Sequence, residues 1–301
     1  MSANPITTAQ QWHDHPPRSV ASEAPVTGAL LCPPDHFDVI DVRNAHMEGQ
    51  VGTIDQELAH NQWLGLTDAI ESLGLSIHLL EAQDQLVDEV FTANPSLVTN
   101  DGEGIPRAII GRMSHPNRRL ESSKHRQVLE KIGLPCQEIA DHIDGCWEGN
   151  GDTLKHPGRA LLWCGIGSRS DIDCHLEVGR MLDLEVAFLQ LPEPHFYHLD
   201  TALTLLDENC AAFVPAAFDE TGQALLQTAF DRLIEVDDRE ARELLAGNLW
   251  CPDARHILMS AGATVTRSRL ETAGFQVVEI ETGEFLKSGG SVFCMRQEIR
   301  A

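Results

Sequence analysis

The sequence has few basic residues for its length. Its 301 residues include 22 Lys and Arg against 46 Asp and Glu, so the formal net charge is -24. Only four of the basic residues are lysines, at positions 124, 131, 155 and 287. A chain with this balance repels phosphate backbones and anionic headgroups, which argues against nucleic acid or a membrane surface as a partner.

Long apolar runs are also absent. No stretch of about 18 apolar residues occurs, so no membrane-spanning helix is expected. Residues 1–28 carry four prolines among polar residues and lack the apolar segment of a signal peptide. We therefore expect a flexible N-terminal extension over residues 1–28, followed by a single domain over residues 29–301, in a cytoplasmic protein.

Motifs for metals and dinucleotides are missing. The eight cysteines form no C-x-x-C pair, and none is spaced with histidines as in a zinc finger. His195 and His198 lie close together, but no H-E-x-x-H pattern or third ligand accompanies them. A G-x-G at Gly165 lacks the third glycine of a dinucleotide site. We therefore expect reduced cysteines and neither a metal nor an organic cofactor.

What the sequence does contain is a repeated pattern of a helix followed by a strand. In three copies a helix with apolar residues three and four apart stops at Gly74, Gly133 or Gly274, and an alternating apolar strand follows. A fourth copy has Asp183 in the glycine's place, and a fifth, weaker copy covers residues 225–236. The pattern predicts an α/β fold of five quasi-symmetric modules; the alternative is an ordinary open α/β sheet.

The first of these helices is the clearest. Trp63, Leu66 and Ile70 share one face of it, so the helix needs a sheet to cover. Thr53 and Gln56 have the spacing of a capping box, which places the start of the helix between them.

Chemically active residues recur at similar distances after the helix stops. Glu148 and His198 each lie 15 residues after the stop position of their module, and Asn94 and Cys294 each lie 20 residues after theirs. Equivalent positions in a ring of modules converge on one axis, so these four side chains are expected in one pocket. A thiol, an imidazole, a carboxylate and an amide provide a nucleophile, a base and orienting groups.

The local sequence around these residues leaves alternatives open. Cys294 follows Gly289 and Gly290, which allow close approach of a ligand, although a buried strand cysteine after a turn fits the local sequence too. His198 and Asp200 are two residues apart, so on a strand they point to one face and into a cleft. Glu148 begins an acidic, glycine-rich segment that is typical of a turn between strands, or of a solvated acidic loop.

Several segments, taken in order, resemble the guanidino-group-modifying enzymes of the pentein fold. This family includes arginine deiminase, amidinotransferases, dimethylarginine dimethylaminohydrolase and arginine dihydrolase. The resemblance extends from about residue 31 to residue 299, and it rests on residues 32–38 (CPPDHFD), 91–94 (FTAN), 148–152 (EGNGD), 196–201 (FYHLDT) and 285–290 (FLKSGG). It implies a five-module αβ propeller with pseudo-fivefold symmetry, an active site on the axis, and a homo-oligomer such as a dimer.

The resemblance also implies the catalytic roles. Cys294 would attack the guanidinium carbon and form a covalent thiouronium intermediate. His198 would protonate the departing amine and then deprotonate the hydrolytic water, while Glu148 would hold the imidazole and favour its charged form. Asp200 would accept two guanidinium N–H groups in a bidentate pair.

Further residues correspond to the part of the family site that holds the amino-acid end of the substrate. Arg118 and Arg169 match the arginines that bind the substrate carboxylate. Asn44 matches an asparagine that contacts the ligand in the dihydrolase branch, although residues 45–46 are Ala-His here where that branch commonly has Pro-Trp.

Two positions favour one branch of the family. Asn94 stands where deiminases and amidinotransferases usually have aspartate and where arginine dihydrolases have asparagine. An amide beside one carboxylate also tolerates a neutral ureido group, which permits a second hydrolysis of citrulline to ornithine. Asp200 favours unmethylated nitrogens. The leading hypothesis is an arginine dihydrolase; the alternatives are a deiminase, an amidinotransferase, a dimethylaminohydrolase, or a non-catalytic protein that binds an amino acid.

Overall fold

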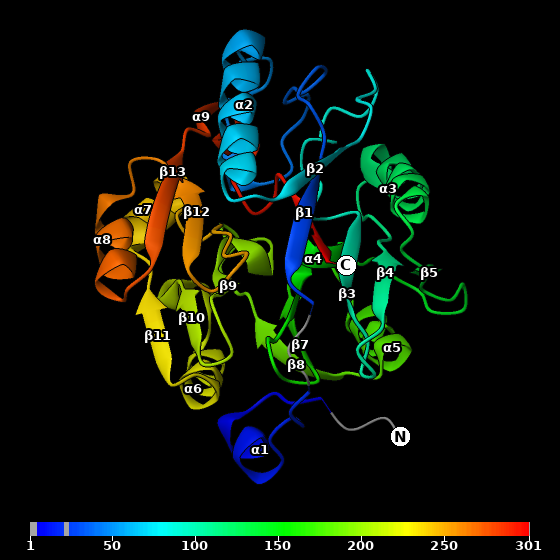
Figure 1. Ribbon diagram of the computed structural model, residues 1–301, viewed down its shortest axis with the longest axis vertical. Coiled ribbons are helices and arrows are strands. Elements are labelled where there is room, and N and C mark those ends of the chain that lie inside the picture. Colours follow the sequence, from blue (N-terminus) through cyan, green and yellow to red (C-terminus); the bar gives the residue numbers. More distant parts are fainter. Residues whose placement is uncertain (1–4, 21–23, 301) are drawn as a thin grey trace.

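Five small sheets surround a common centre in the computed structural model, which describes residues 5–20 and 24–300 (Figure 1). In the first module, β14 (Gln297–Arg300) pairs antiparallel with β1 (Val26–Leu31), and β1 pairs in parallel with β2 (Ser76–Leu79). The crossover between β1 and β2 contains α2 (Gln56–Ser72). The chain therefore closes the ring by pairing its last strand with its first.

The next three modules repeat this arrangement of an antiparallel strand, a central strand, a helix and a parallel strand. The second module consists of β3 (Ser96–Asn100), β4 (Pro106–Ile110), α3 (Arg119–Lys131) and β5 (Cys136–Glu138). The third consists of β6 (Thr153–Lys155), β7 (Leu161–Ile166), α5 (Ile172–Leu182) and β8 (Glu185–Gln190). The fourth consists of β9 (Leu203–Leu205), β10 (Cys210–Phe213), α6 (Glu220–Ala229) and β11 (Arg232–Glu235).

The fifth module has a shortened first strand. Trp250 makes a single antiparallel bridge to Leu258 of β12 (His256–Ser260), and β12 pairs in parallel with β13 (Gln276–Ile280) after α8 (Thr264–Thr272). The remaining short helices are α1 (Ala9–Asp14), α4 (Gly149–Asp152), α7 (Asp238–Leu244), α9 (Gly283–Leu286), η1 (Ala45–Met47), η2 (Pro116–Arg118), η3 (Leu199–Thr201) and η4 (Pro215–Ala217). The α/β propeller of five modules is thus confirmed.

The helix stops have the backbone conformation that the sequence predicts. The φ angles are 77° at Gly74, 92° at Gly133 and 100° at Gly274, all in the left-handed region that favours glycine. Asp183, which replaces glycine in the fourth copy, also has a positive φ of 52°. Each helix can therefore end sharply and return the chain to its sheet.

The first long helix, α2, starts differently from the sequence prediction. Asp55 caps it by accepting a hydrogen bond from the Leu58 N–H at 3.0 Å, whereas the hydroxyl of Thr53 donates to the Gln50 carbonyl at 2.9 Å. The predicted capping box is therefore wrong. The apolar face is as expected, because Leu66 and Ile70 are buried in one cluster with side chains of β1.

The N-terminal segment packs on the propeller, which differs from the flexible extension expected over residues 1–28. The ring of Trp12 in α1 is 6% exposed and stacks on Trp163 with centroids 5.6 Å apart. The Ile6 N–H donates to the Val186 carbonyl at 2.9 Å, so this segment extends the edge of β8. Residues 1–4 and 21–23 lie outside the described residues. No helix in the described part of the chain is long and apolar enough to cross a membrane.

Candidate active site

One buried residue of each module precedes the first strand of that module's sheet. The five residues are Asn94, Glu148, His198, Asn248 and Cys294. The same end of the propeller holds a small cavity, whose lining includes Asn94, His198 and Cys294. The convergence predicted from the module spacing is therefore found in the structure, with a fifth residue added to the four.

The Cys294 thiol lies at the centre of this arrangement and is 2% exposed. Its Sγ is 3.1 Å from Asp200 Oδ2 and accepts a contact from Asn248 Nδ2 at 3.2 Å. Cys294 lies in a turn before β14, not in a strand, and its N–H donates to Asn248 Oδ1 at 3.1 Å. Burial and the adjacent Asp200 carboxylate raise the pKa of Cys294 well above its ordinary value, so the thiol is neutral in the free protein.

Asp200 has one carboxylate oxygen without a partner. Oδ2 accepts from the Cys294 thiol, whereas Oδ1 is buried and has no hydrogen bond from any of the described residues. Burial raises the pKa of Asp200 to about 6, against the attraction of the His198 charge, which lowers it. A buried acceptor without a donor is unfavourable, so this oxygen has the capacity to accept a further hydrogen bond.

His198 and Glu148 form a buried pair. His198 Nε2 lies 2.7 Å from Glu148 Oε2. Burial lowers the pKa of His198, but Asp152 and then Glu148 more than offset this effect, so its pKa is raised overall. Burial raises the pKa of Glu148, but the hydrogen bond and the charge of His198 lower it by more. The net pKa is below its ordinary value, so this carboxyl is ionised at neutral pH.

The backbone around these two residues differs from the sequence prediction. His198 occupies the N-cap position of the short helix η3, without a capping hydrogen bond from its side chain, and η3 contains Asp200. The two residues are therefore not on a strand. Glu148 lies at the start of α4 and is completely buried, so the segment is neither a turn between strands nor a solvated loop. The short helices at the axis bring both side chains inward, and the tertiary contacts rather than the local residue pattern fix their direction.

Asn94 is held in one orientation by its neighbours. Its Oδ1 accepts a hydrogen bond from Arg118 Nη1 at 3.0 Å, and its Nδ2 faces His198 Nδ1 at 3.4 Å. Gly151 allows this approach, because a Cβ at that position would lie 2.3 Å from Asn94 Nδ2. The amide therefore presents a fixed pattern of donor and acceptor to the cavity.

Arg118 differs from a simple carboxylate receptor. It is buried, Nε and Nη2 donate to Glu121 at 3.0 and 2.7 Å, and Nη2 also donates to the Phe91 carbonyl at 3.0 Å. Most of its N–H groups are thus used inside the protein. Arg118 positions Asn94, and of its five donors at most one on Nη1 remains for a ligand.

The other two predicted ligand-binding residues line the cavity. The Arg169 guanidinium lies over the Tyr197 ring at 4.9 Å from the centroid, and its Nη1 is 3.4 Å from Glu148 Oε2. Asn44 donates from Nδ2 to the Ser288 carbonyl at 3.1 Å and caps η1. Arg169 is the better placed cation for a substrate carboxylate, because it is partly exposed at the cavity.

Sequence reasoning missed several residues of this site, of which four carry polar groups that matter for its chemistry. Asn248 holds Cys294, while Arg43, Asp88 and Tyr197 line the cavity, with Arg43 Nη1 and Asp88 Oδ2 2.6 Å apart. Asn248 lies 18 residues after Phe230, where α6 ends, so the spacings of 15 and 20 found elsewhere lead close to Asn248 but not to the residue itself. Arg43 and Asp88 have no comparable signal, because their pairing joins distant segments.

The described residues contain no group of three or more His, Cys, Asp or Glu side chains that could hold a metal ion. The chemistry available in the cavity is that of a thiol, an imidazole–carboxylate pair, a second carboxylate and amides. These groups fit nucleophilic attack on a cationic carbon centre with proton transfer by histidine. They define the class of cysteine enzymes that modify guanidino groups.

Comparisons with known proteins agree with this class. A family model described as "N,N dimethylarginine dimethylhydrolase, eukaryotic" matches residues 34–301, so the chain belongs to this family of guanidino-group hydrolases. The N(G),N(G)-dimethylarginine dimethylaminohydrolase of Mycobacterium tuberculosis is 33% identical over 89% of this chain and 84% of that protein. The fold is accordingly that of the pentein enzymes.

Two cyanobacterial proteins are similar to a comparable degree. The bifunctional arginine dihydrolase/ornithine cyclodeaminase AgrE of Nostoc sp. is 31% identical over 88% of this chain and 37% of that protein. The substrate-bound N-terminal domain of ArgZ, an arginine dihydrolase from cyanobacteria, superposes with a TM-score of 0.83 at 31% identity, covering 90% of this chain and 97% of that domain. The chain thus spans little more than a third of the bifunctional relatives.

Proposed function

We propose that this protein hydrolyses arginine, or a close guanidino compound, and that it does so twice, releasing ornithine, carbon dioxide and ammonia. The observation that carries the proposal is the unpartnered Oδ1 of Asp200 beside the Cys294 thiol. A planar guanidinium can donate two N–H groups to this carboxylate and place its carbon beside Sγ. The same ligand is a cation, which suits a buried carboxylate.

Binding of the cation also prepares the nucleophile. Cys294 is neutral in the free protein because burial and Asp200 raise its pKa. A guanidinium bound to Asp200 offsets the negative charge of that carboxylate and favours the thiolate. The side-chain amide of Asn248, whose Nδ2 is 3.2 Å from Sγ, donates a hydrogen bond that stabilises the thiolate further. Substrate binding and thiol activation are therefore coupled.

Proton transfer is assigned to His198. Its Nε2 is held by Glu148, so Nδ1 is the ring nitrogen that faces the other groups of the cavity. In the first step the bond between Sγ and the guanidinium carbon forms, the terminal C–N bond breaks, and Nδ1 gives a proton to the departing ammonia. The neutral imidazole then removes a proton from water, which attacks the thiouronium carbon and releases Cys294.

Asn94 supports the second hydrolysis. After the first step the bound product carries a neutral ureido group, which a site with two carboxylates would bind poorly. Beside Cys294 and His198 the structure has the carboxylate of Asp200 and the amide of Asn94, whose orientation is fixed by Arg118. The cavity carboxylate of Asp88 is already paired with Arg43. Retention of citrulline permits a second attack by Cys294 on the ureido carbon, in which the bond to the terminal nitrogen breaks and the second ammonia leaves. Water then hydrolyses the resulting thiocarbamate and releases Cys294, and the carbamate so formed loses carbon dioxide to give ornithine. The similarity to arginine dihydrolases supports this order of events.

The second candidate is hydrolysis of N,N-dimethylarginine. The 33% identity to the mycobacterial dimethylaminohydrolase favours it as much as the 31% identity to AgrE favours arginine. Asp200 disfavours it, because methylation removes N–H groups that the unpartnered Oδ1 would accept. Arginine therefore fits the site better.

Product analysis separates the candidates. Purified protein is incubated with arginine, citrulline or N,N-dimethylarginine, and citrulline, ornithine, dimethylamine and ammonia are quantified by mass spectrometry and an ammonia assay. We expect ornithine and two ammonia per arginine. Citrulline with one ammonia would contradict the second hydrolysis, and turnover of dimethylarginine alone would favour the second candidate.

A further inference from the structure

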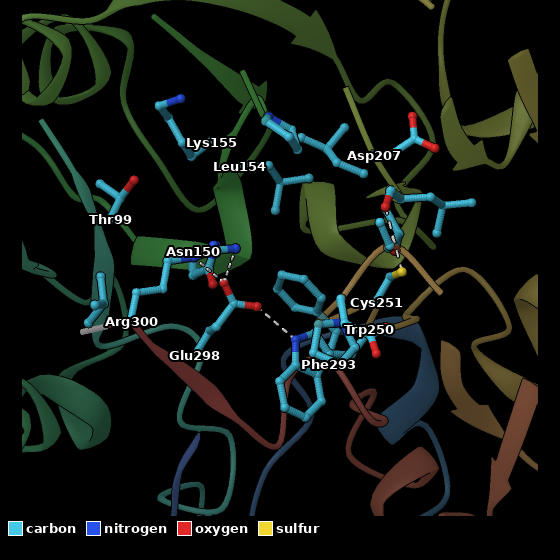
Figure 2. A pocket seen from close by; sticks show the side chains of 18 of the residues that line it. Thr99, Asn150, Leu154, Lys155, Asp207, Trp250, Cys251, Phe293, Glu298 and Arg300 are labelled. Carbon is cyan, nitrogen blue, oxygen red and sulfur yellow. Dashed lines mark hydrogen bonds and ion pairs between the residues drawn. The ribbon is translucent and has the colours of Figure 1, made fainter. Parts of the chain in front are cut away.

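A second cavity lies on the same axis as the active site, beyond the first strands of the modules. Its volume is about 330 Å³, within the range of small-molecule sites. All five modules contribute to it, including Thr99 of β3, Lys155 of β6, Asp207 after β9, Cys251 and Glu298 of β14 (Figure 2). The active-site residues precede these strands, so this axial pocket is at their opposite end.

Arg296 lies in the wall between the axial pocket and the active site. It follows Cys294 by two residues, lines the axial pocket and is 1% exposed. Its Cζ lies 3.6 Å from the Phe293 ring centroid and 5.1 Å from that of Trp250. The two rings hold the guanidinium in place, and stacking of this kind leaves its edge available for hydrogen bonds.

The guanidinium of Arg296 is poorly satisfied. Among the described residues its hydrogen bond is the one from Nη1 to Asn150 Oδ1 at 3.1 Å, and Nε is buried without a partner. The Glu298 carboxylate accepts from Trp250 Nε1 at 2.8 Å and pairs with Arg300, so its charge favours the Arg296 cation without a hydrogen bond between the two side chains. A buried guanidinium with five N–H donors and one protein acceptor is suited to an anionic ligand.

Apart from Arg296, the axial pocket is lined by more carboxylates than cations: Asp207, Glu208, Asp253 and Glu298, against Lys155 and Arg300. Asp207 and Glu208 are partly exposed, and their edge of the axial pocket is called its mouth. A ligand that carries both a carboxylate and an ammonium group complements a cation at the floor and carboxylates at the mouth. A simple anion would be repelled at the mouth by these residues and by the net charge of the chain.

We propose that the axial pocket binds a free α-amino acid with a basic side chain, whose carboxylate pairs with Arg296 and whose cationic groups face Asp207 and Glu208. The carboxylate of the ligand would complete the hydrogen bonding of the guanidinium in a bidentate pair. This binding site follows from its own residues and does not depend on the proposed reaction.

Occupation of the axial pocket would also affect the active site. The positive charge of Arg296 is one of the influences that lower the pKa of Asp200, although burial is the larger and opposite one. A carboxylate bound to Arg296 offsets that positive charge, which otherwise repels a cation at Asp200, and so strengthens the binding of a guanidinium there. An amino acid in the axial pocket is therefore expected to lower the KM for the guanidino substrate.

Calorimetric titration of the full chain with L-ornithine tests the proposal. The mouth variant Asp207→Asn/Glu208→Gln removes two negative charges at partly exposed positions. The matched control, Asp68→Asn/Glu71→Gln, makes the same charge change on the exposed face of α2. Arg169→Ala weakens binding at the catalytic cavity only. We expect the dissociation constant of one L-ornithine binding event to rise at least tenfold in the mouth variant. The same binding event should be unchanged in the control and in Arg169→Ala.

Arg296→Gln gives a second test once its thermal unfolding shows that it folds, and it should abolish the same binding event. Identical titrations of the wild type and the mouth variant would overturn the proposal, as would loss of every binding event in Arg169→Ala. The two proposals can fail separately. If the protein does not turn over arginine but still binds L-ornithine in a way that Asp207→Asn/Glu208→Gln weakens, the proposed function is refuted and the axial binding site is supported.

Discussion

Replacing Asp200 by asparagine should abolish turnover and stabilise the fold. The side chain is fully buried, and burial raises the pKa of the carboxyl from 3.8 to about 6. A pKa raised from 3.8 to about 6 corresponds to roughly 3 kcal/mol of destabilisation when the group is ionised in the folded protein. Asparagine has the same shape, its Oδ1 can still accept from the Cys294 thiol, and its amide replaces an oxygen that has no partner.

The pH dependence of this effect follows from its sign. Because the pKa of Asp200 is raised on folding, the folded state binds the proton more tightly than the unfolded state. The destabilisation is therefore absent below about pH 3.8, grows as the pH rises through 6, and is complete above about pH 7. At pH 5 roughly half of the 3 kcal/mol should be present.

Urea unfolding of the wild type and Asp200→Asn at pH 5 and pH 8 measures the difference. We expect Asp200→Asn to be more stable by about 3 kcal/mol at pH 8 and by about half of that at pH 5. Asp68→Asn, at an exposed position on α2, is the control and should change little. A variant that is no more stable than the wild type at pH 8, or a gain that is independent of pH, would refute the assignment of Asp200 as a buried charge kept for binding.

Three other substitutions test the roles of the neighbours. Asn248→Ala removes the N–H donor to Cys294 Sγ, so alkylation of Cys294 by a haloacetamidine at pH 7, followed by intact mass, should slow about tenfold. Glu148→Gln removes a charge that raises the pKa of His198, so the alkaline limb of the kcat profile should move to lower pH. Asn94→Asp should shift the product of arginine from ornithine to citrulline, measured by mass spectrometry.

Each of these substitutions has an outcome that contradicts its reasoning. Unchanged alkylation in Asn248→Ala, with native thermal stability, would mean that the amide does not stabilise the thiolate. A kcat profile of Glu148→Gln that coincides with the wild type would remove His198 as the titrating group. Ornithine as the main product of Asn94→Asp would show that the amide does not decide between one and two hydrolyses.

The repeat could be predicted from the sequence because its determinants are local. A left-handed helix stop requires glycine, or a residue such as Asp183, at one position, and the apolar faces of the helices recur around it. Counting from these stops then located Asn94, Glu148, His198 and Cys294 in one pocket. The same count ends close to Asn248 but not on it, and an asparagine in a loop has no motif that separates it from a turn residue.

The conformation of the site segments was beyond local reasoning. His198 and Asp200 lie at a short helix, not on a strand, because their backbone follows the axis of the propeller. Arg118 shows a related difficulty, since its burial against Glu121 and the Phe91 carbonyl commits N–H groups that the sequence leaves free. Long-range packing also decides the place of Trp12, which docks on a ring of the third module.

The most direct test of the central claim is to give arginine labelled with 15N at both terminal guanidino nitrogens to the wild type and to Cys294→Ser. Serine keeps the size of the side chain but removes the thiolate nucleophile. The structure predicts that the wild type releases two labelled ammonia and one ornithine per arginine, and that Cys294→Ser, folded as judged by thermal unfolding, releases none. Release of labelled ammonia by Cys294→Ser at the wild-type rate, or its absence with both proteins, would contradict the account.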